Sequence, residues 1–142
     1  DLVLTSDVII GFPGETEAEA MDTVSLVEEV GFDALFTFIY SPRPGTKAAA
    51  MPDPATRAEK QKWFDKLLEV QNANSAKLHA AYVGKTVRVL VDGESDDENF
   101  PLASRTEGNR LVRLTGGEGL IGQFVDVKIT GANKGSLSGE PA

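Results

Sequence analysis

The sequence predicts an α/β unit over residues 1–83, followed by a small antiparallel, OB-like β-barrel over residues 84–142. Three observations support this fold class. A strand, a helix and a second strand follow one another with short turns, which is the order of a βαβ unit. Each of these strands ends at a corner built from glycine and proline. After Gly84 the pattern changes to short strands separated by glycine turns, which is typical of small barrels.

Residues 8–10 (Val-Ile-Ile) are a β-branched run typical of a parallel strand that is buried on both faces. The corner that follows contains Gly11 and Gly14, which accept backbone angles that a Cβ forbids. Thr16 and Glu19 then have the spacing of a capping box at the start of a helix. We therefore expect a β-to-α turn at the carboxyl end of a parallel strand, where α/β folds bind their ligands.

A helix over residues 17–30 and a strand over residues 32–40 complete the predicted βαβ unit. Residues 41–46 (Ser-Pro-Arg-Pro-Gly-Thr) cannot extend that strand because two prolines remove ladder donors, so we expect a rigid loop. A long helix over residues 55–82 follows, and we interpret it as a bridge between the two units. The residues near one face of this helix, most of them apolar, are Trp63, Leu67, Val70, Asn74, Leu78 and Tyr82.

The second unit alternates apolar and polar residues, beginning with valines at 87, 89 and 91. Gly108 and Asn109 signal a hairpin turn. Residues 92–99 are expected to form an acidic, turn-rich loop, and residues 135–142 a loose tail apart from a last short strand. The predicted strands after the first are residues 102–107, 110–115, 124–129 and 136–139.

Composition restricts the function. The chain has 142 residues, a net charge of −8 and no cysteine, so it offers no thiolate nucleophile and no thiolate metal ligand. The acidic balance argues against unspecific nucleic-acid binding by the whole surface. No apolar run has the length of a membrane helix and no signal peptide is visible, so we expect a cytoplasmic protein without a membrane partner. Because the chain begins without Met inside a buried-strand pattern, we expect a piece of a longer protein.

The motifs GFPGET and FDALFTFIYSPRPGT, together with residues 104–112 (Ser-Arg-Thr-Glu-Gly-Asn-Arg-Leu-Val), resemble the C-terminal part of the radical-SAM methylthiotransferase family, in its tRNA-modifying, MiaB-type branch. The resemblance implies the last βα units of a partial, TIM-like radical-SAM barrel, followed by a TRAM RNA-binding barrel. It also implies S-adenosylmethionine and two 4Fe-4S clusters in the full-length enzyme, which would add a methylthio group to an isopentenyl-adenosine in the anticodon arm of tRNA.

Two departures from the family pattern matter. The CxxxCxxC cluster motif is absent, so this part alone is expected to be inactive and to need the N-terminal half of the same protein. Ser104 stands where the TRAM motif usually has glycine. We predict no catalytic or metal-ligating residue in this chain, since the single histidine, His79, has no partner cluster.

The resemblance implies two cofactor-binding residues, Ile9 and Gly11, and the chemistry of the loop after the second strand adds Arg43 as a third candidate. Ile9 would pack on the adenine of S-adenosylmethionine, and Gly11 would let the ligand approach the strand. Asp7 replaces the first glycine of the family's strand motif, and Glu15 sits one place late. Arg43, held between two prolines, could contact a cofactor carboxylate or an RNA phosphate. The alternatives are that the glycines only shape the turn and that Arg43 is a solvated surface residue.

In the second unit, Arg105 and Arg110 are predicted to contact RNA phosphates, with Thr106 and Asn109 making polar contacts. Arg113 and Lys128 would extend these residues into a basic strip. The alternative is that the arginines decorate the solvent face of a half-buried sheet. We predict core packing for Phe38 and Trp63 and a surface position for His79.

Three functions compete. The first is the C-terminal part of a tRNA methylthiotransferase, the second a ribosomal-protein methylthiotransferase, and the third a stand-alone RNA- or protein-binding module. A cysteine triad upstream of this chain favours an enzyme, whereas a native start codon at its first residue favours the module. The basic loop at Arg43 favours the tRNA branch, because phosphate-bearing substrates attract cations.

Overall fold

The computed structural model describes residues 2–142, and these divide into two compact units, Val3–Asn74 and Ser75–Ala142. The division falls inside the long helix α2. Each unit has a hydrophobic core of its own. The elements of the first unit are β1 (Thr5–Ile10), α1 (Glu17–Val30), β2 (Ala34–Ile39), the short 3-10 helix η1 (Ala48–Ala50) and the start of α2 (Arg57–Ala80).

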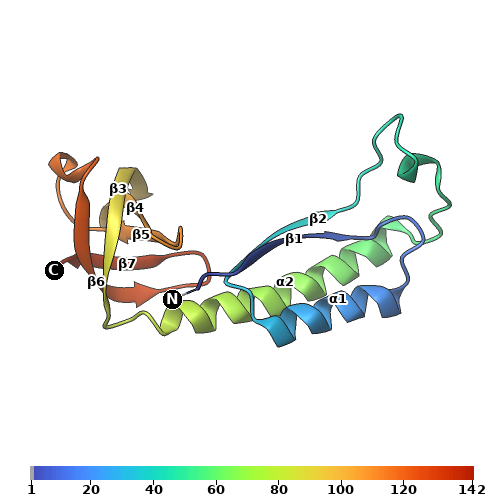
Figure 1. Ribbon diagram of the computed structural model, residues 1–142, viewed down its shortest axis with the longest axis horizontal. Helices are drawn as coiled ribbons and strands as arrows, with labels where there is room; N and C mark the ends of the chain where they lie inside the picture. Colours follow the sequence, from blue (N-terminus) through green and yellow to red (C-terminus); the bar gives the residue numbers. More distant parts are fainter. Residues whose placement is uncertain (1) are drawn as a thin grey trace. The chain divides into compact units, whose positions relative to one another are not determined.

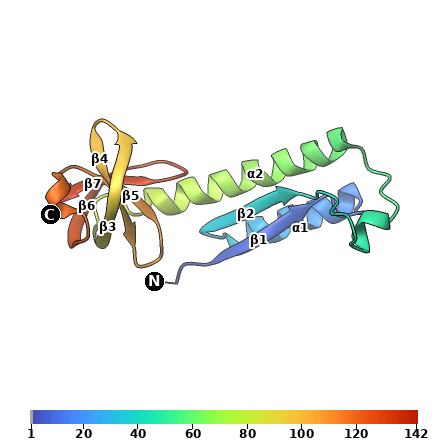
Figure 2. The same cartoon turned by 90° about the horizontal axis from the view of Figure 1, so that it is seen from above.

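The predicted βαβ unit is confirmed. Strands β1 and β2 pair in parallel, with Ile10 opposite Ile39 (Figure 2). Helix α1 begins at the predicted capping box, in which the Glu19 N–H donates to Thr16 Oγ1 at 3.3 Å and the Thr16 N–H donates to Glu19 Oε2 at 2.8 Å. It ends at Gly31 in the left-handed conformation, with φ 67°. The local sequence signals therefore set both ends of this helix.

Both helices cover the same face of the β1–β2 sheet (Figure 1). The core of this unit joins Ile10 to apolar residues of α1 and to Trp63 and Leu67 of α2. The opposite face is open: Ile9 is 54% exposed and Phe38 is 56% exposed. The predictions of a strand buried on both faces and of core packing for Phe38 are therefore wrong within residues 2–142. Alternate strand residues point away from the helices, and no described element covers them.

Helix α2 begins with reciprocal hydrogen bonds between Thr56 and Glu59, at 2.7 Å and 3.2 Å. The backbone hydrogen bond from Thr56, reinforced by its hydroxyl, lowers the pKa of Glu59. The ionised cap stabilises the helix start above the ordinary pKa of this carboxyl, and the contribution is lost as the pH falls through the lowered pKa. Farther along the helix, Gln71 and Asn74 donate to the carbonyl oxygens of Phe32 and Val27 at 3.0 Å and 3.1 Å. These bonds fix the helix to the rest of the first unit.

Among the described residues, the second unit is a closed barrel of five strands in the order β3-β4-β5-β7-β6 (Figure 2). Their bounds are β3 (Thr86–Asp97), β4 (Phe100–Thr106), β5 (Leu111–Leu114), β6 (Phe124–Ala132) and β7 (Leu137–Pro141). The predicted barrel is confirmed, but it is not wholly antiparallel because β5 and β7 pair in parallel. A closed ring with an odd number of strands cannot alternate direction at every pair, so a parallel pair is unavoidable.

One segment expected to be irregular is largely a strand. The acidic residues 92–97 continue β3, and the pairing with β4 shifts register between Val91 and Gly93 and again between Glu94 and Asp97. These irregularities let an acidic, glycine-containing segment stay in the ladder. The last short strand predicted at residues 136–139 is present as β7, which pairs with both β5 and β6 and completes the barrel. No helix in the described part of the chain has the length and apolar character needed to cross a bilayer.

Candidate functional site

A pocket of about 430 Å³ lies at the carboxyl end of the β1–β2 sheet. Ile9 of β1 and Arg43 of the loop after β2 both line it, so the fold brings together two of the three residues predicted to bind a cofactor. The pocket is mainly apolar, with a few polar groups, as small-molecule sites usually are. Its other lining residues are Phe38, Ile39, Tyr40, Ser41, Thr46 and Ala48.

Arg43 is presented by a turn with internal hydrogen bonds. Thr46 donates to the Arg43 carbonyl oxygen twice, from its hydroxyl at 2.8 Å and from its backbone N–H at 3.3 Å. The same hydroxyl accepts from the Ala49 N–H at 3.3 Å. The prolines on both sides of Arg43 restrict the chain further. The arginine side chain is exposed, and its backbone is held in a compact turn beside the pocket.

Tyr40 supplies the pocket with a polar group that the sequence reading did not assign. Its backbone N–H donates to the Ile10 carbonyl oxygen at 2.8 Å, which extends the parallel pairing by one step. Its ring contacts Phe12 edge-on, with the centroids 5.4 Å apart. Its hydroxyl oxygen is buried, and among residues 2–142 it has no hydrogen-bond partner.

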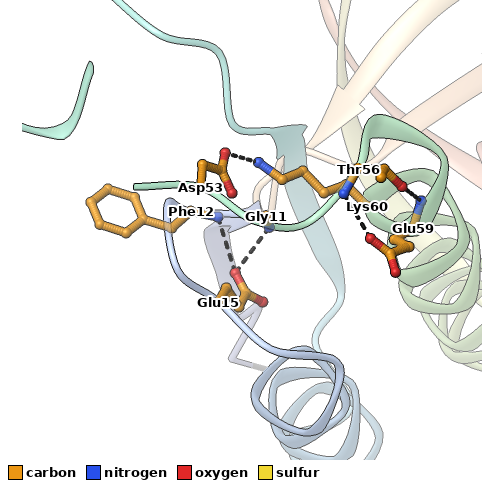
Figure 3. A network of polar contacts seen from close by, with 7 residues as sticks. All are labelled: Gly11, Phe12, Glu15, Asp53, Thr56, Glu59 and Lys60. Carbon is orange, nitrogen blue, oxygen red and sulfur yellow. Dashed lines mark hydrogen bonds and ion pairs between the residues drawn. The ribbon is translucent and has the colours of Figure 1, made fainter. Parts of the chain in front are cut away.

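Gly11 lies at the end of β1, where a lysine from α2 passes over it (Figure 3). Its φ is +77°, and a Cβ at this position would lie 2.5 Å from Lys60 Cδ. Lys60 is only 7% exposed and forms an ion pair with Asp53. Gly11 is not among the residues that line the pocket; the close neighbour that explains a glycine here is Lys60. Lys60 carried no local sequence signal, because it meets Gly11 only in the folded unit.

Glu15 closes the same corner. Its Oε2 accepts from the Gly11 N–H at 2.9 Å and from the Phe12 N–H at 3.1 Å (Figure 3). A carboxylate that accepts two backbone N–H groups holds the turn in one conformation. The glutamate that appeared one place late in the motif therefore has a structural role in this corner.

The predicted basic strip does not form one row of free cations. Arg105 of β4 is 45% exposed at its side chain and lies 3.9 Å from Asp92. Arg113 of β5 forms an ion pair with Asp96 at 2.9 Å. Lys128 is on β6, on the far side of β3 from Arg105. Of this set, Arg105 and Lys128 present exposed cationic side chains.

The Arg110 side chain is buried and does not lie on the surface of the barrel. Only 8% of it is exposed, its Nε donates to the Tyr82 hydroxyl at 3.2 Å, and its guanidinium carbon lies 4.9 Å from the Tyr82 ring centroid. Its backbone N–H donates to Thr106 Oγ1 at 3.1 Å, which closes the hairpin. Asn109 occupies the left-handed position of this turn, with φ 62°, and is exposed. Arg110 thus positions the hairpin that carries Thr106 and Asn109.

Two further residues differ from expectation. His79 is 7% exposed, and its Nδ1 lies 2.6 Å from the Asn133 carbonyl oxygen, so the predicted surface position is wrong. Ser104 is fully buried in the barrel, where its hydroxyl donates to the Val112 carbonyl oxygen at 2.8 Å. The serine that replaces the motif glycine therefore acts inside the barrel and not on a binding face.

The closed barrel defines the class of the second unit: residues 80–142 match the family model described as the TRAM domain. Over its whole length the chain is similar to curated proteins named tRNA-2-methylthio-N(6)-dimethylallyladenosine synthase. It is 47% identical over 99% of its length to the protein of Aromatoleum aromaticum, of which it covers 32%. For the proteins of Thermoanaerobacter sp. and Chromobacterium violaceum the identities are 46% and 48%, again over 99% of this chain, which covers 30% and 32% of them.

The chain thus spans about a third of the length of the curated relatives it matches. The resemblance to MiaB-type synthases that the motifs indicated is confirmed by this identity over the whole chain and by the TRAM match.

Proposed function

We propose that this chain is the C-terminal part of a radical-SAM tRNA methylthiotransferase, and that it provides one wall of the S-adenosylmethionine site and a tRNA-binding module. The pocket at the carboxyl end of β1 and β2 carries the first part of the proposal, because it joins Ile9 and Arg43 at the place where α/β folds bind ligands. The similarity over the whole chain supports the second part. In this reading the first unit is the end of a partial TIM-like barrel.

The residues present fit S-adenosylmethionine. Ile9 and Phe38 offer apolar surface for an adenine ring, and Arg43 offers a cation for a carboxylate. Gly11 would act indirectly: because it has no Cβ, the Lys60 side chain can pass over the end of β1. When bound to its iron–sulfur cluster, S-adenosylmethionine supplies radical chemistry. This chain contains no cysteine, so the thiolate ligands of both 4Fe-4S clusters come from the rest of the enzyme.

The proposed substrate is an isopentenyl-adenosine in the anticodon arm of a cytoplasmic tRNA. The relatives' names specify tRNA, which favours this substrate over a ribosomal protein and over a stand-alone binding module. On the barrel, Arg105 would contact phosphate, Thr106 and Asn109 would place polar groups at the hairpin, and Arg110 would hold that hairpin through Tyr82. Residues 75–142 contain eight basic and nine acidic side chains, so most of the net charge belongs to the first unit. A nearly neutral barrel does not repel RNA as a whole.

Replacing Arg43 by alanine in the full-length, cluster-loaded enzyme should weaken S-adenosylmethionine binding about tenfold, because a charge-assisted hydrogen bond is lost. Isothermal titration calorimetry measures the dissociation constant, and mass spectrometry of digested tRNA measures the methylthio-adenosine formed by the wild type. Arg57→Ala, which removes the same charge at the start of α2 outside the pocket, is the control. Equal affinities for wild type and Arg43→Ala would remove Arg43 from the site. Failure of the wild type to modify tRNA would overturn the proposed activity.

Replacing Arg105 by alanine should weaken binding of unmodified tRNA by the full chain about three- to tenfold. The slope of the logarithm of the binding constant against the logarithm of the salt concentration should become less steep, by about the amount expected for one phosphate contact. Filter binding at several salt concentrations gives both values. Lys66→Ala makes the same charge change on α2 and should bind like the wild type, since its ammonium group already lies near Glu69. An Arg105→Ala protein with the wild-type salt slope would rule out a phosphate contact at this residue.

A further inference from the structure

We infer that the outer face of β6, β3 and β4 is a stacking surface for the bases of single-stranded RNA. This surface consists of Arg88, Leu90, Arg105 and Phe124. The inference rests on the proposed RNA-binding function and deepens it, because it assigns the base contacts to residues outside the hairpin of Thr106 and Asn109. Phe124 is the central residue.

Strand register places Arg105, Leu90 and Phe124 in one row across the barrel, and Arg88 lies two residues before Leu90 on β3. Leu90 of β3 is opposite Arg105 of β4 on one side and opposite Phe124 of β6 on the other. Side chains on one face of neighbouring strands at opposed positions lie within contact distance. Phe124 is 64% exposed and Leu90 is 38% exposed, although the valines next to Leu90 along β3 are fully buried. The barrel therefore fills its interior and still leaves an aromatic ring and a leucine on its outside.

Arg88 gives this apolar surface a cationic edge. Its guanidinium carbon lies 5.1 Å from the centroid of the Phe124 ring. Asp126 is opposite Arg88 in the register, but within residues 2–142 no carboxylate lies within ion-pair distance of the Arg88 guanidinium. Its N–H donors thus remain available to a phosphate while the guanidinium group stays near the ring. Arg105 lies at the other end of the row; its side chain is 45% exposed and lies 3.9 Å from Asp92.

Two acidic residues border this surface, since Asp92 lies 3.9 Å from Arg105 and Asp126 is opposite Arg88, whereas the cluster at residues 96–98 lies farther along the chain. Asp96, Asp97 and Glu98 lie at the far end of β3 and in its turn, where β3 pairs with the first residues of β4. The surface uses the part of β3 that pairs with β6, before the first register shift. An exposed aromatic ring between two arginines on a barrel matches the combination of stacking and cation that binds single-stranded nucleic acid. A protein partner would not require cations at both ends of the row.

The test measures binding of a fluorescein-labelled 12-nucleotide oligo(A) RNA to the full chain by fluorescence anisotropy, with a double-stranded RNA of equal length as the second probe. Phe124→Ala should weaken oligo(A) binding roughly tenfold and affect the duplex much less, because a duplex offers no free base faces. Phe124→Trp should retain the affinity, and its fluorescence should be quenched when the RNA binds. Val83→Ala is the matched control, since Val83 is an exposed apolar residue of the same unit before β3 begins.

Each outcome is decisive. Because Phe124 is largely exposed, the Phe124→Ala protein should keep the wild-type thermal midpoint, so a loss of affinity reports contact and not unfolding. Wild-type affinity in Phe124→Ala, with the wild type binding oligo(A), would overturn the stacking surface and leave the proposed function intact. If the same variant instead abolished self-association in sedimentation and left RNA binding unchanged, the face would be a protein contact. Failure of the wild type to bind either RNA would overturn both proposals.

Discussion

Gly139→Ala should destabilise the barrel by roughly 3 kcal/mol, because the added methyl group has no space. A Cβ at Gly139 would lie 2.3 Å from the Lys128 carbonyl oxygen and 2.7 Å from Val127 Cγ1. Gly139 is opposite Ile129 on β6 and opposite Leu114 on β5, so β7 passes between two strands at this point. The neighbouring backbone cannot move aside as a flexible side chain can, and β7 must shift away from β6.

Hydrogen exchange followed by mass spectrometry measures this effect locally. Peptides from β6 and β7 should lose protection in Gly139→Ala, whereas peptides from α1 should not change. Gly93→Ala is the control, because Gly93 is also in a barrel strand and a Cβ there meets nothing within 4 Å. It should change the free energy of unfolding by less than about 1 kcal/mol. Equal protection in the two variants would show that β7 does not pack against β6 as described.

Gly11→Ala should destabilise the first unit by roughly 2–3 kcal/mol, through two costs that add. The first is the left-handed backbone, with φ +77°, which a residue with a Cβ rarely adopts. The second is crowding against Lys60, whose Cδ and Cγ would lie 2.5 Å and 2.8 Å from the new atom. Displacing Lys60 also breaks its ion pair with Asp53 and leaves a buried ammonium group without its partner.

Urea unfolding monitored by fluorescence measures this effect, because the chain's single tryptophan, Trp63, lies in the core of the first unit. Gly14→Ala separates the two costs: Gly14 has φ +85° but open space around its Cβ position. The free energy of unfolding of Gly14→Ala should fall by only about 1 kcal/mol, from backbone strain alone. If both variants were equally stable, the contact between Lys60 and Gly11 would contribute nothing.

Local signals predicted the ends of elements well. Thr16 and Glu19 start α1, Gly31 ends it, and Asn109 turns the β4–β5 hairpin. These features depend on hydrogen bonds and backbone angles within a few residues, so the sequence of a short segment contains the information. The same is true of the alternating valines, which point into the barrel as their period requires.

Burial and partners were predicted less well. Alternation shows which residues share a face of β1 and β2, but whether that face is covered depends on elements far along the chain. For this reason Ile9 and Phe38 are exposed, although both are large apolar residues of the kind usually found in a core. Likewise, the residues next to Arg110 in the sequence do not indicate that its guanidinium hydrogen-bonds to Tyr82, 28 residues away. The residues next to Gly11 do not indicate that Lys60 packs against it.

The sequence by itself determined the strand–helix–strand order, the glycine corner after β1, the rigid turn at Arg43 and the change to a small barrel after α2. The tertiary structure decided that β7 closes this barrel beside β5, that Ile9 and Arg43 line one pocket, and that Arg88 and Phe124 meet on the outer face. The physical reason is the distance along the sequence between the residues that interact. Turns and caps arise from neighbouring residues, whereas closure, pockets and surfaces arise from contacts between segments that only the complete fold brings together.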